Sequence, residues 1–229
     1  MKSNSIYALV AVLSLVMNAH AEWHVWTVTE TRHVLRSDPP GHDRAVEVGA
    51  AQNEWVSFQV LLRCDEPVKA VRLEADELRG PGGATLPMSE SRCYRQHQLH
   101  LETGTYRNRA FKPDGYPDPL IPFHHPLTGD TLGSARLVAV PFDLRADETH
   151  GFWVDVFVPS EAKAGEYKGV CRVTVRGETA QEVPVELAVW DFSLPETPAM
   201  RTALGSPAGR LRGYYAKRAK DGKEEAPAD

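Results

Sequence analysis

Three adjacent Asp-Glu pairs are the first residues in this sequence that could do chemistry. Glycoside hydrolysis, for example, uses two carboxyl groups held several ångströms apart on either side of the scissile bond. Each pair here falls at a predicted strand end or turn, where carboxylates are ordinarily solvated, and neighbouring side chains on a strand point to opposite faces. We therefore predict no catalytic residue among them. The pairs are Asp65-Glu66, Asp76-Glu77 and Asp147-Glu148.

A second candidate is the C-x3-H-x2-H pattern of Cys93, His97 and His100, which superficially resembles a set of metal ligands. On a strand, positions 97 and 100 face opposite sides, so they cannot complete one tetrahedral site without a bulge. The tandem His124-His125 is more typical of a loop surface than of a ligand pair. Neither a G-x-S-x-G nucleophile elbow nor a glycine-rich phosphate loop occurs. We expect no metal and no cofactor.

Aromatic rings are the remaining candidates, because exposed rings can stack on sugars. The alternative, which we favour, is that they pack a long loop onto the rest of the fold. We select four residues as candidate contacts to a carbohydrate or to another domain: Tyr106, Tyr116, Asp118 and Trp153. The wider aromatic set comprises Tyr106, Phe111, Tyr116, Phe123 and Trp153.

The elements that must position these residues are predicted to be strands, because apolar and polar residues alternate with a period of two. Residues 53–63 place Val56, Phe58, Val60 and Leu62 on one face. Similar alternation marks residues 71–78, 152–159, 167–176 and 183–190, and weaker candidates are residues 23–29, 44–50, 94–102 and 135–144. No sustained helical stripe occurs between residues 22 and 198. The pattern predicts an all-β fold, an antiparallel β-sandwich of immunoglobulin-like or jelly-roll-like type.

Two local features differ from the alternation of apolar and polar residues that marks the strands. Gly165-Glu166-Tyr167 resembles a tyrosine corner, in which the phenol bonds a backbone group a few residues upstream, although an ordinary core tyrosine fits equally well. Residues 103–134 are rich in proline and break the alternation, so we predict a long irregular loop there. Its aromatic residues indicate that it docks on a surface rather than remaining disordered.

The two ends of the chain predict its organisation. Residues 1–21 have a basic start, an apolar stretch and an A-x-A cleavage signal, which is typical of a secretory signal peptide. We therefore expect export to the periplasm, the extracellular space or the cell surface. The sandwich is predicted over residues 22–194 and a proline-containing linker over residues 195–199. Residues 200–229 are predicted to start a further domain, with a short strand, a weakly helical segment and a polar tail.

Charge and cysteine content narrow the range of partners. The formal net charge of −5 and the absence of a basic stripe argue against nucleic acid as a partner. Three cysteines in an exported chain permit one disulfide and leave one thiol. The sequence does not choose the pairing among Cys64, Cys93 and Cys171, although Cys171 lies in phase with an inward strand face and could equally be a buried free thiol.

Several stretches together resemble a known family. They are residues 53–63, 115–123, 152–175 and 183–205, with WVDVFVP and WDFSLP as the most specific parts. These stretches are similar to the N-terminal β-sandwich of proteins related to glycoside hydrolase family 123. The resemblance implies that a (β/α)8-type catalytic domain follows the sandwich and hydrolyses terminal β-linked N-acetylgalactosamine by substrate-assisted catalysis. It also implies that the catalytic Asp-Glu pair belongs to that barrel, and none of the pairs in this chain sits in a matching motif.

The sequence therefore predicts a non-catalytic accessory sandwich that supports a catalytic barrel absent from this chain. Residues 200–205 would correspond to the first barrel strand, and we expect no hexosaminidase activity from the chain alone. An alternative is a free-standing carbohydrate-binding or surface adhesion module. A third is a gene fragment without an independent function.

Overall fold

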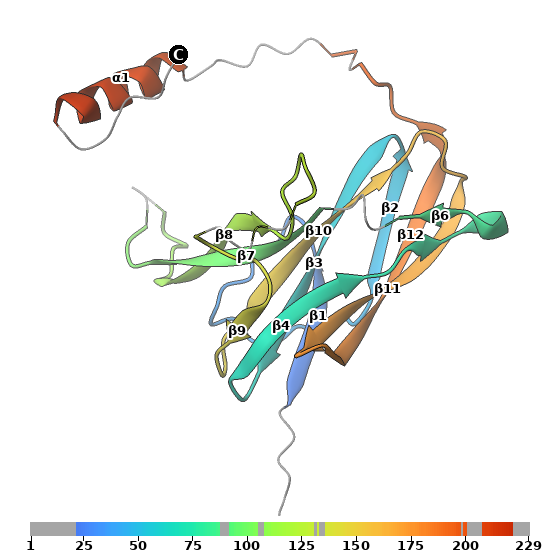
Figure 1. Ribbon diagram of the computed structural model, residues 1–229, viewed down its shortest axis with the longest axis horizontal. Coiled ribbons are helices and arrows are strands. Elements are labelled where there is room, and N and C mark those ends of the chain that lie inside the picture. The colour runs from blue at the N-terminus through green and yellow to red at the C-terminus, as the bar shows by residue number, and fades with distance from the viewer. Residues whose placement is uncertain are drawn as a thin grey trace, which may run out of the picture. The chain divides into compact units, whose positions relative to one another are not determined.

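A computed structural model describes residues 22–87, 92–104, 108–130, 132, 136–197, 199–200 and 208–221. The chain divides into two compact units, residues 1–194 and residues 195–229. The first unit consists of strands packed in two layers (Figure 1). The second contains one helix.

The first layer is a five-stranded sheet in which every neighbouring pair is antiparallel. Its central strand β10 lies between β3 and β7, and the two edges are β1 and β8. This order brings strands far apart in the sequence side by side. The strands are β1 (Trp23–Thr29), β3 (Glu54–Cys64), β10 (His150–Val158), β7 (Arg92–Leu101) and β8 (Asp114–Pro122).

The second layer is a seven-stranded sheet whose main path runs β2-β12-β11-β4-β9, with β5 paired to β11 and β6 paired to β5. The strands are β2 (Val46–Gln52), β4 (Val68–Ala75), β5 (Leu78–Arg79), β6 (Thr85–Leu86), β9 (Phe142–Leu144), β11 (Gly165–Val175) and β12 (Glu178–Ser193). A 3-10 turn η1 (Pro81–Gly83) joins β5 to β6. The pairing of β2 with β12 is parallel, so the predicted antiparallel sandwich has one exception.

This exception follows from a corner at Asn53. The residue has a positive φ of 57° and joins β2 in one sheet directly to β3 in the other. Asparagine tolerates the left-handed region better than most residues, so it suits a corner where the chain changes layers. Because β2 turns away at this corner instead of forming a hairpin, its partner in the sheet is the distant strand β12.

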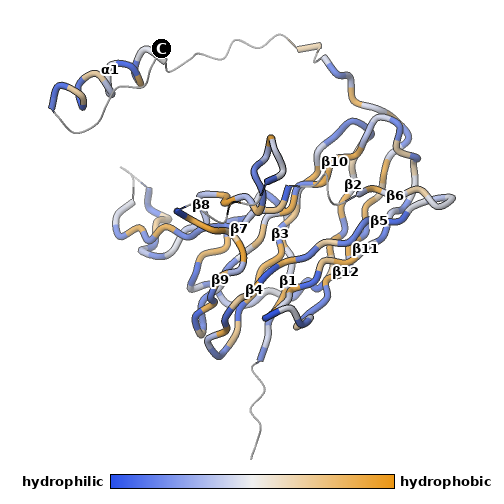
Figure 2. Tube along the Cα trace, in the orientation of Figure 1, coloured by the Kyte–Doolittle hydropathy of each residue, from blue (hydrophilic) through white to orange (hydrophobic). Residues whose placement is uncertain are grey.

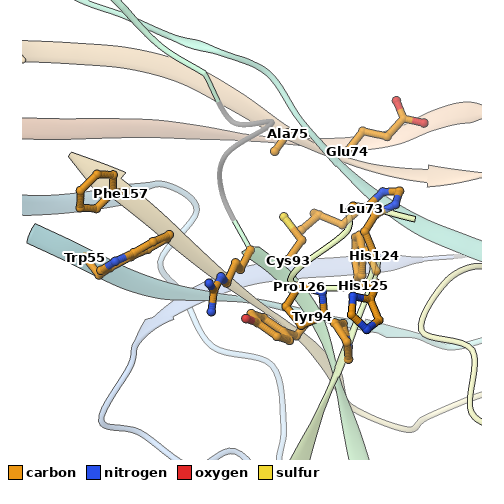
Figure 3. Close-up of a pocket in the computed structure, with 14 residues that line it drawn as sticks. Trp55, Leu73, Glu74, Ala75, Cys93, Tyr94, His124, His125, Pro126 and Phe157 are labelled. Atoms are coloured by element: carbon orange, nitrogen blue, oxygen red, sulfur yellow. The ribbon is translucent and has the colours of Figure 1, made fainter. Parts of the chain in front are cut away.

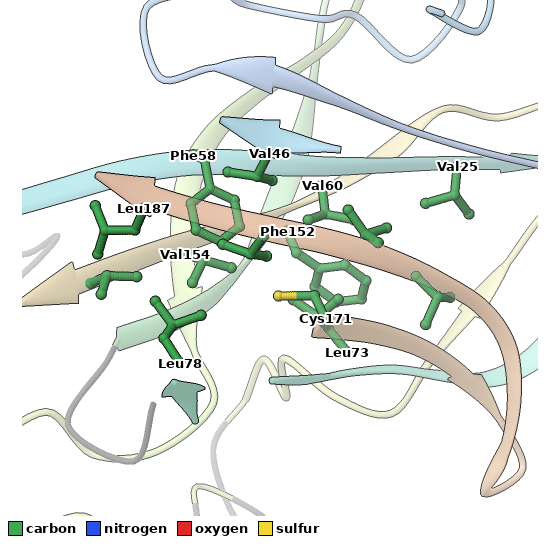
Figure 4. Packing of buried hydrophobic residues seen from close by; sticks show 14 of the residues in the cluster. Val25, Val46, Phe58, Val60, Leu73, Leu78, Phe152, Val154, Cys171 and Leu187 are labelled. Carbon is green, nitrogen blue, oxygen red and sulfur yellow. The ribbon is translucent and has the colours of Figure 1, made fainter. Parts of the chain in front are cut away.

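The core lies between the two layers and consists of the apolar phase of each strand. Phe58 on β3, Phe152 on β10 and Leu187 on β12 are all at most 1% exposed. Figure 2 shows the alternation of hydrophobic and hydrophilic residues along these strands, and Figure 4 shows the buried side chains meeting between the layers. The inward faces predicted from the sequence are confirmed, with Cys171 buried among them.

A smaller cluster lies on the opposite face of the five-stranded sheet. Trp26, Val34 and Leu61 are buried together there. The segment after β1 covers this face, and the side-chain amide of Gln59 donates to the backbone oxygens of Thr29 and Arg32, at 2.7 and 2.8 Å. This cover explains why the polar phase of β3, which a two-layer sandwich would expose, is buried at residues 59 and 61.

The predicted long loop is wrong for part of its length, because residues 114–122 form β8. Prolines cannot donate to a sheet, which is why they are confined to edge strands and bulges. β8 meets both conditions: it is the edge strand, and it has one more residue than β7 between the pairs Gln96 with Leu120 and Gln98 with Pro117. The weak strand predicted at residues 135–144 is also largely wrong, since only β9 forms there.

The tyrosine corner is confirmed. The same residue is also a core tyrosine, so both alternatives hold for Tyr167. Tyr167 is 1% exposed, and its hydroxyl donates to the backbone oxygen of Lys163 at 2.9 Å. Gly80 packs directly on the Tyr167 ring, where a Cβ would collide with it. The phenol thus joins the turn before β11 to the core.

The second unit contains α1 (Ala208–Lys220), which confirms the weakly helical segment. The predicted barrel strand at residues 200–205 lies outside the described residues except for Met200, which is exposed. The predicted signal peptide, residues 1–21, and the polar tail from residue 222 also lie outside them. Within the described part of the chain, no helix is long and apolar enough to cross a membrane.

Candidate functional site

The carboxylate pairs predicted to be non-catalytic each have a partner of their own. Asp76 binds both terminal nitrogens of Arg172, at 2.6 and 2.7 Å, and these hydrogen bonds hold the pKa of Asp76 below its usual value. Asp65 accepts from the backbone nitrogen of Glu22 at 2.7 Å, and Asp147 lies 3.4 Å from Arg63. These contacts tie strands and turns together. They do not place two free carboxyl groups across a cleft.

The cysteine and histidine pattern on β7 forms no metal centre in the described residues, where no group of three His, Cys, Asp or Glu side chains is placed to hold a metal ion. The register between β7 and β8 shifts around His97, but the extra residue belongs to β8, so the bulge is not in the strand that carries His97 and His100. All three cysteines are free thiols. Burial raises the pKa of Cys93 and of Cys171 to about 12.

The four residues selected from the sequence are not brought together. Tyr116 and Asp118 lie on β8, Trp153 lies on β10 with β7 between them, and Tyr106 lies outside the described residues. Along β7 the partner of Tyr116 is Leu99, whereas that of Trp153 is Tyr94.

Two of the three described candidate side chains, Tyr116 and Trp153, have local contacts. The Tyr116 ring stacks on Phe111 with centroids 5.7 Å apart, and its hydroxyl donates to the backbone oxygen of Lys112 at 2.9 Å. Nε1 of Trp153 donates to Asp155 at 2.5 Å. Asp118 is exposed. The alternative of local aromatic packing therefore describes the Tyr116 ring well.

A groove of 840 Å³ lies elsewhere, where the two layers meet near the start of β7. Trp55 and Phe157 lie at one end of it, and His124, His125 and Pro126 lie at the other, with Cys93 between them (Figure 3). Leu73, Glu74 and Ala75 of β4 form the wall on the side of the seven-stranded sheet. The volume is within the range of about 300–1,000 Å³ typical of ligand sites.

The aromatic end of this groove is held in place by its neighbours. The Trp55 and Phe157 rings are 5.0 Å apart, and the Arg92 guanidinium lies 5.4 Å from the Trp55 ring centre. Trp55 is nonetheless 46% exposed. A large ring that is fixed on one side and open on the other is a preorganised contact surface.

A second exposed aromatic group lies at the end of β12, where the first unit ends. Trp190 and Phe192 are 48% and 53% exposed, and their rings stack with centroids 5.9 Å apart. With Leu194, which is 38% exposed, they form what we call the end patch. The register with β2 shifts between Val189 and Ser193, so the aromatic pair projects from an irregular part of the strand.

The exit of the chain from the sandwich is fixed beside this patch. The backbone nitrogen of Leu194 donates to the oxygen of Gln52 at 2.9 Å, and the Asn53 side chain donates to the oxygen of Leu194 at 3.0 Å. The corner that joins the two layers therefore also holds the last residue of the first unit. These bonds fix the end of the first unit on the sandwich.

Comparison with known proteins decides the family. The profile of the glycoside hydrolase 123 N-terminal domain matches residues 26–175, well over half of the chain. The chain belongs to this family. The resemblance inferred from the sequence is thereby confirmed, and the sandwich is a family 123 N-terminal domain. No curated protein matches the sequence.

One solved structure agrees on the fold. A family 123 glycoside hydrolase from Clostridium perfringens, studied for glycolipid glycan hydrolysis, is similar with a TM-score of 0.61 and 14% identity. The likeness covers 76% of this chain but only 28% of the C. perfringens chain. The N-terminal domain of PorA has a TM-score of 0.33 and 7% identity, and the match covers 75% of this chain and all (100%) of that chain. The bacterial hydrophobin BslA has a TM-score of 0.26 and 10% identity, and the match covers 73% of this chain and 93% of that chain. Scores this low add nothing to the assignment.

Sequence reasoning missed both the groove and the end patch of this family 123 N-terminal domain. One signal was present: Trp55 lies in the same strand phase as Ser57 and Gln59, so a large aromatic residue occupies the polar face of β3. Trp190 is likewise an aromatic residue in the polar phase of β12. Aromatic residues out of phase with the core are therefore a better indicator of surface sites here than aromatic residues in a loop.

Proposed function

We propose that this chain is the non-catalytic N-terminal sandwich of an exported glycoside-hydrolase-like protein related to β-N-acetylgalactosaminidases. Its role is to pack on and support a catalytic (β/α)-barrel. The observation that carries the proposal is the end patch, an exposed aromatic pair beside the fixed exit of the chain in a domain of this family. In family relatives the partner of the sandwich would be that barrel.

The end patch suits an interface between domains. Stacked apolar rings that are half-exposed in an isolated domain gain free energy when a neighbour covers them. Their position immediately before the connector means that the next domain starts within reach, at a high effective concentration. A modest apolar contact is then sufficient to hold the two domains together.

The proposal assigns no catalytic residue to the sandwich, because the carboxylate pairs support strands and turns. Purified 229-residue chain is expected to give no turnover of an aryl β-N-acetylgalactosaminide, with the C. perfringens enzyme as the positive control. Hydrolysis above the no-enzyme rate would contradict the assignment.

Docking can be tested in a chimera, because residues 22–194 have their own core. Residues 22–200 would replace the N-terminal sandwich of the C. perfringens enzyme. We expect Trp190→Ser with Phe192→Ser to lower the melting temperature of the catalytic domain and to increase protease cleavage in the connector. Trp55→Ala, a matched tryptophan away from the end patch, should change neither. Equal behaviour of the two variants would count against docking at the end patch.

Export is the second part of the proposal and rests on residues 1–21. Expression in a bacterial host should yield a periplasmic or secreted product. Its N-terminal sequence should begin at Glu22. A cytoplasmic product that keeps Met1 would overturn the predicted export.

A further inference from the structure

Beyond the supporting role, we propose that the groove between Trp55 and His125 binds a short, neutral oligosaccharide. Tyr116, Asp118 and Trp153 do not line this groove, whereas Cys93, Phe123, His124 and His125, which the sequence analysis also considered, do. The groove is also separate from the end patch, since it opens on the five-stranded sheet and the start of β7.

The first argument is the exposed ring of Trp55. The axial C–H groups of a pyranose form a flat apolar face that stacks on an aromatic ring, and tryptophan offers the largest such ring. Trp55 is 46% exposed, yet it is contacted by Phe157 and lies under the Arg92 guanidinium. Binding therefore loses little side-chain entropy, because the ring is already fixed.

The second argument is the mixture of hydrogen-bonding groups along the groove. Sugar hydroxyls both donate and accept, so a matching site needs both kinds of group. Arg92 supplies donors, and the Tyr94 hydroxyl, which also bonds with Arg92, can both donate and accept. A purely apolar ligand would offer these groups no hydrogen bonds.

The third argument is the protonation of His125. Its Nδ1 accepts from the backbone nitrogens of Leu127 and Thr128, at 3.3 and 3.2 Å. In the neutral ring the proton must then be on Nε2, which is a donor. His125 lines the groove, so the turn after β8 presents a ring of fixed tautomer to a ligand.

Charge and size point to a neutral oligosaccharide rather than to an anion. Arg92 lies directly opposite Asp155 in the pairing of β7 with β10, so its positive charge has a negative neighbour and the lining does not favour a negative ligand. The volume of 840 Å³ is near the upper end of the range for small-molecule sites. It therefore suits several linked rings better than a single monosaccharide.

The test uses the full 229-residue chain on a printed array of neutral, sialylated and sulfated oligosaccharides. We expect saturable binding to neutral oligosaccharides. The neutral glycan that binds most strongly on the array is then titrated into the protein in a calorimeter. We expect Trp55→Ala to weaken its binding about tenfold or more. Tyr94→Phe, which removes only the hydroxyl, should weaken it several-fold, and circular dichroism should confirm that both variants are folded.

Trp190→Ala is the matched control, because Trp190 is 48% exposed but lies in the end patch. It should bind glycan as the wild-type chain does. Absence of binding to any neutral oligosaccharide, binding to sialylated or sulfated glycans alone, or an equal loss in Trp190→Ala would each overturn the proposal. Because docking is tested at Trp190 and glycan binding at Trp55, either proposal can fail while the other stands.

Discussion

Replacing Tyr167 by phenylalanine removes one hydrogen bond from the tyrosine corner, and Tyr116 supplies a matched control. Both hydroxyls donate to a backbone oxygen four residues upstream at 2.9 Å, that of Lys163 and that of Lys112. The two sites differ in burial: Tyr167 is 1% exposed, whereas the Tyr116 bond is open to solvent. The pair therefore compares a buried with an exposed phenol–carbonyl hydrogen bond, and the Tyr116 hydroxyl additionally accepts a longer bond from the Lys112 nitrogen at 3.3 Å.

The size of the effect follows from the surroundings of the acceptor. A net hydrogen bond contributes about 0.5–1.5 kcal/mol, and a partner left buried and unsatisfied costs about 1–3 kcal/mol. Lys163 is exposed, so water can reach its carbonyl once the phenol oxygen is gone. We expect Tyr167→Phe to lower the free energy of unfolding by about 1–1.5 kcal/mol and Tyr116→Phe by less than about 0.5 kcal/mol.

Urea unfolding of the full chain, followed by tryptophan fluorescence, measures both changes. The midpoint should fall for Tyr167→Phe at an unchanged m-value, and the melting temperature should fall by about 2–6 °C for a unit of this size. Equal shifts for the two variants would refute the argument that burial strengthens the corner. A loss above about 3 kcal/mol for Tyr167→Phe would show that the ring packing against Gly80 had changed as well.

Two further predictions concern titratable groups. Because Arg172 lowers the pKa of Asp76, this carboxylate contributes stability that is present above its unfolded pKa and is lost as the pH falls through the folded one. Urea midpoints of Asp76→Asn and wild type should thus differ at about pH 7 and converge towards about pH 2; a constant difference would contradict this. With pKa values of about 12, Cys93 and Cys171 should resist an aromatic disulfide reagent in the native chain. Denaturation should release three reactive thiols, and finding one would reveal a disulfide.

The strands themselves were largely predictable, because burial of one face imposes a period of two on the sequence. The inward phases of β3, β4, β10, β11 and β12 were all read correctly, and so was the weak helical character of α1. β8 was missed because its prolines are compatible with a strand only at a sheet edge or bulge, and the sequence does not show which strand is the edge.

The candidate site was much less predictable. Its residues come from β3, β4, β7, β10 and the segment after β8. They lie close together only because the five-stranded sheet places β10 between β3 and β7. Alternation records which side of a strand is buried but not which strand lies beside it. The only local indications were aromatic residues in the polar phase, Trp55 on β3 and Trp190 on β12.

The sequence by itself determined the all-β class, the inward faces and the family, since each depends on residues close together in the chain; the hydrogen bond of Tyr167 to Lys163 was decided only by the structure. Tertiary structure decided the parallel pairing of β2 with β12, the edge position of β8 and the exposure of Trp55 and Trp190. The physical reason is that strand pairing and solvent exposure depend on contacts between distant segments. A tryptophan in the polar phase of a strand can be buried under a covering loop, as Trp26 is, or remain open to a ligand, as Trp55 does.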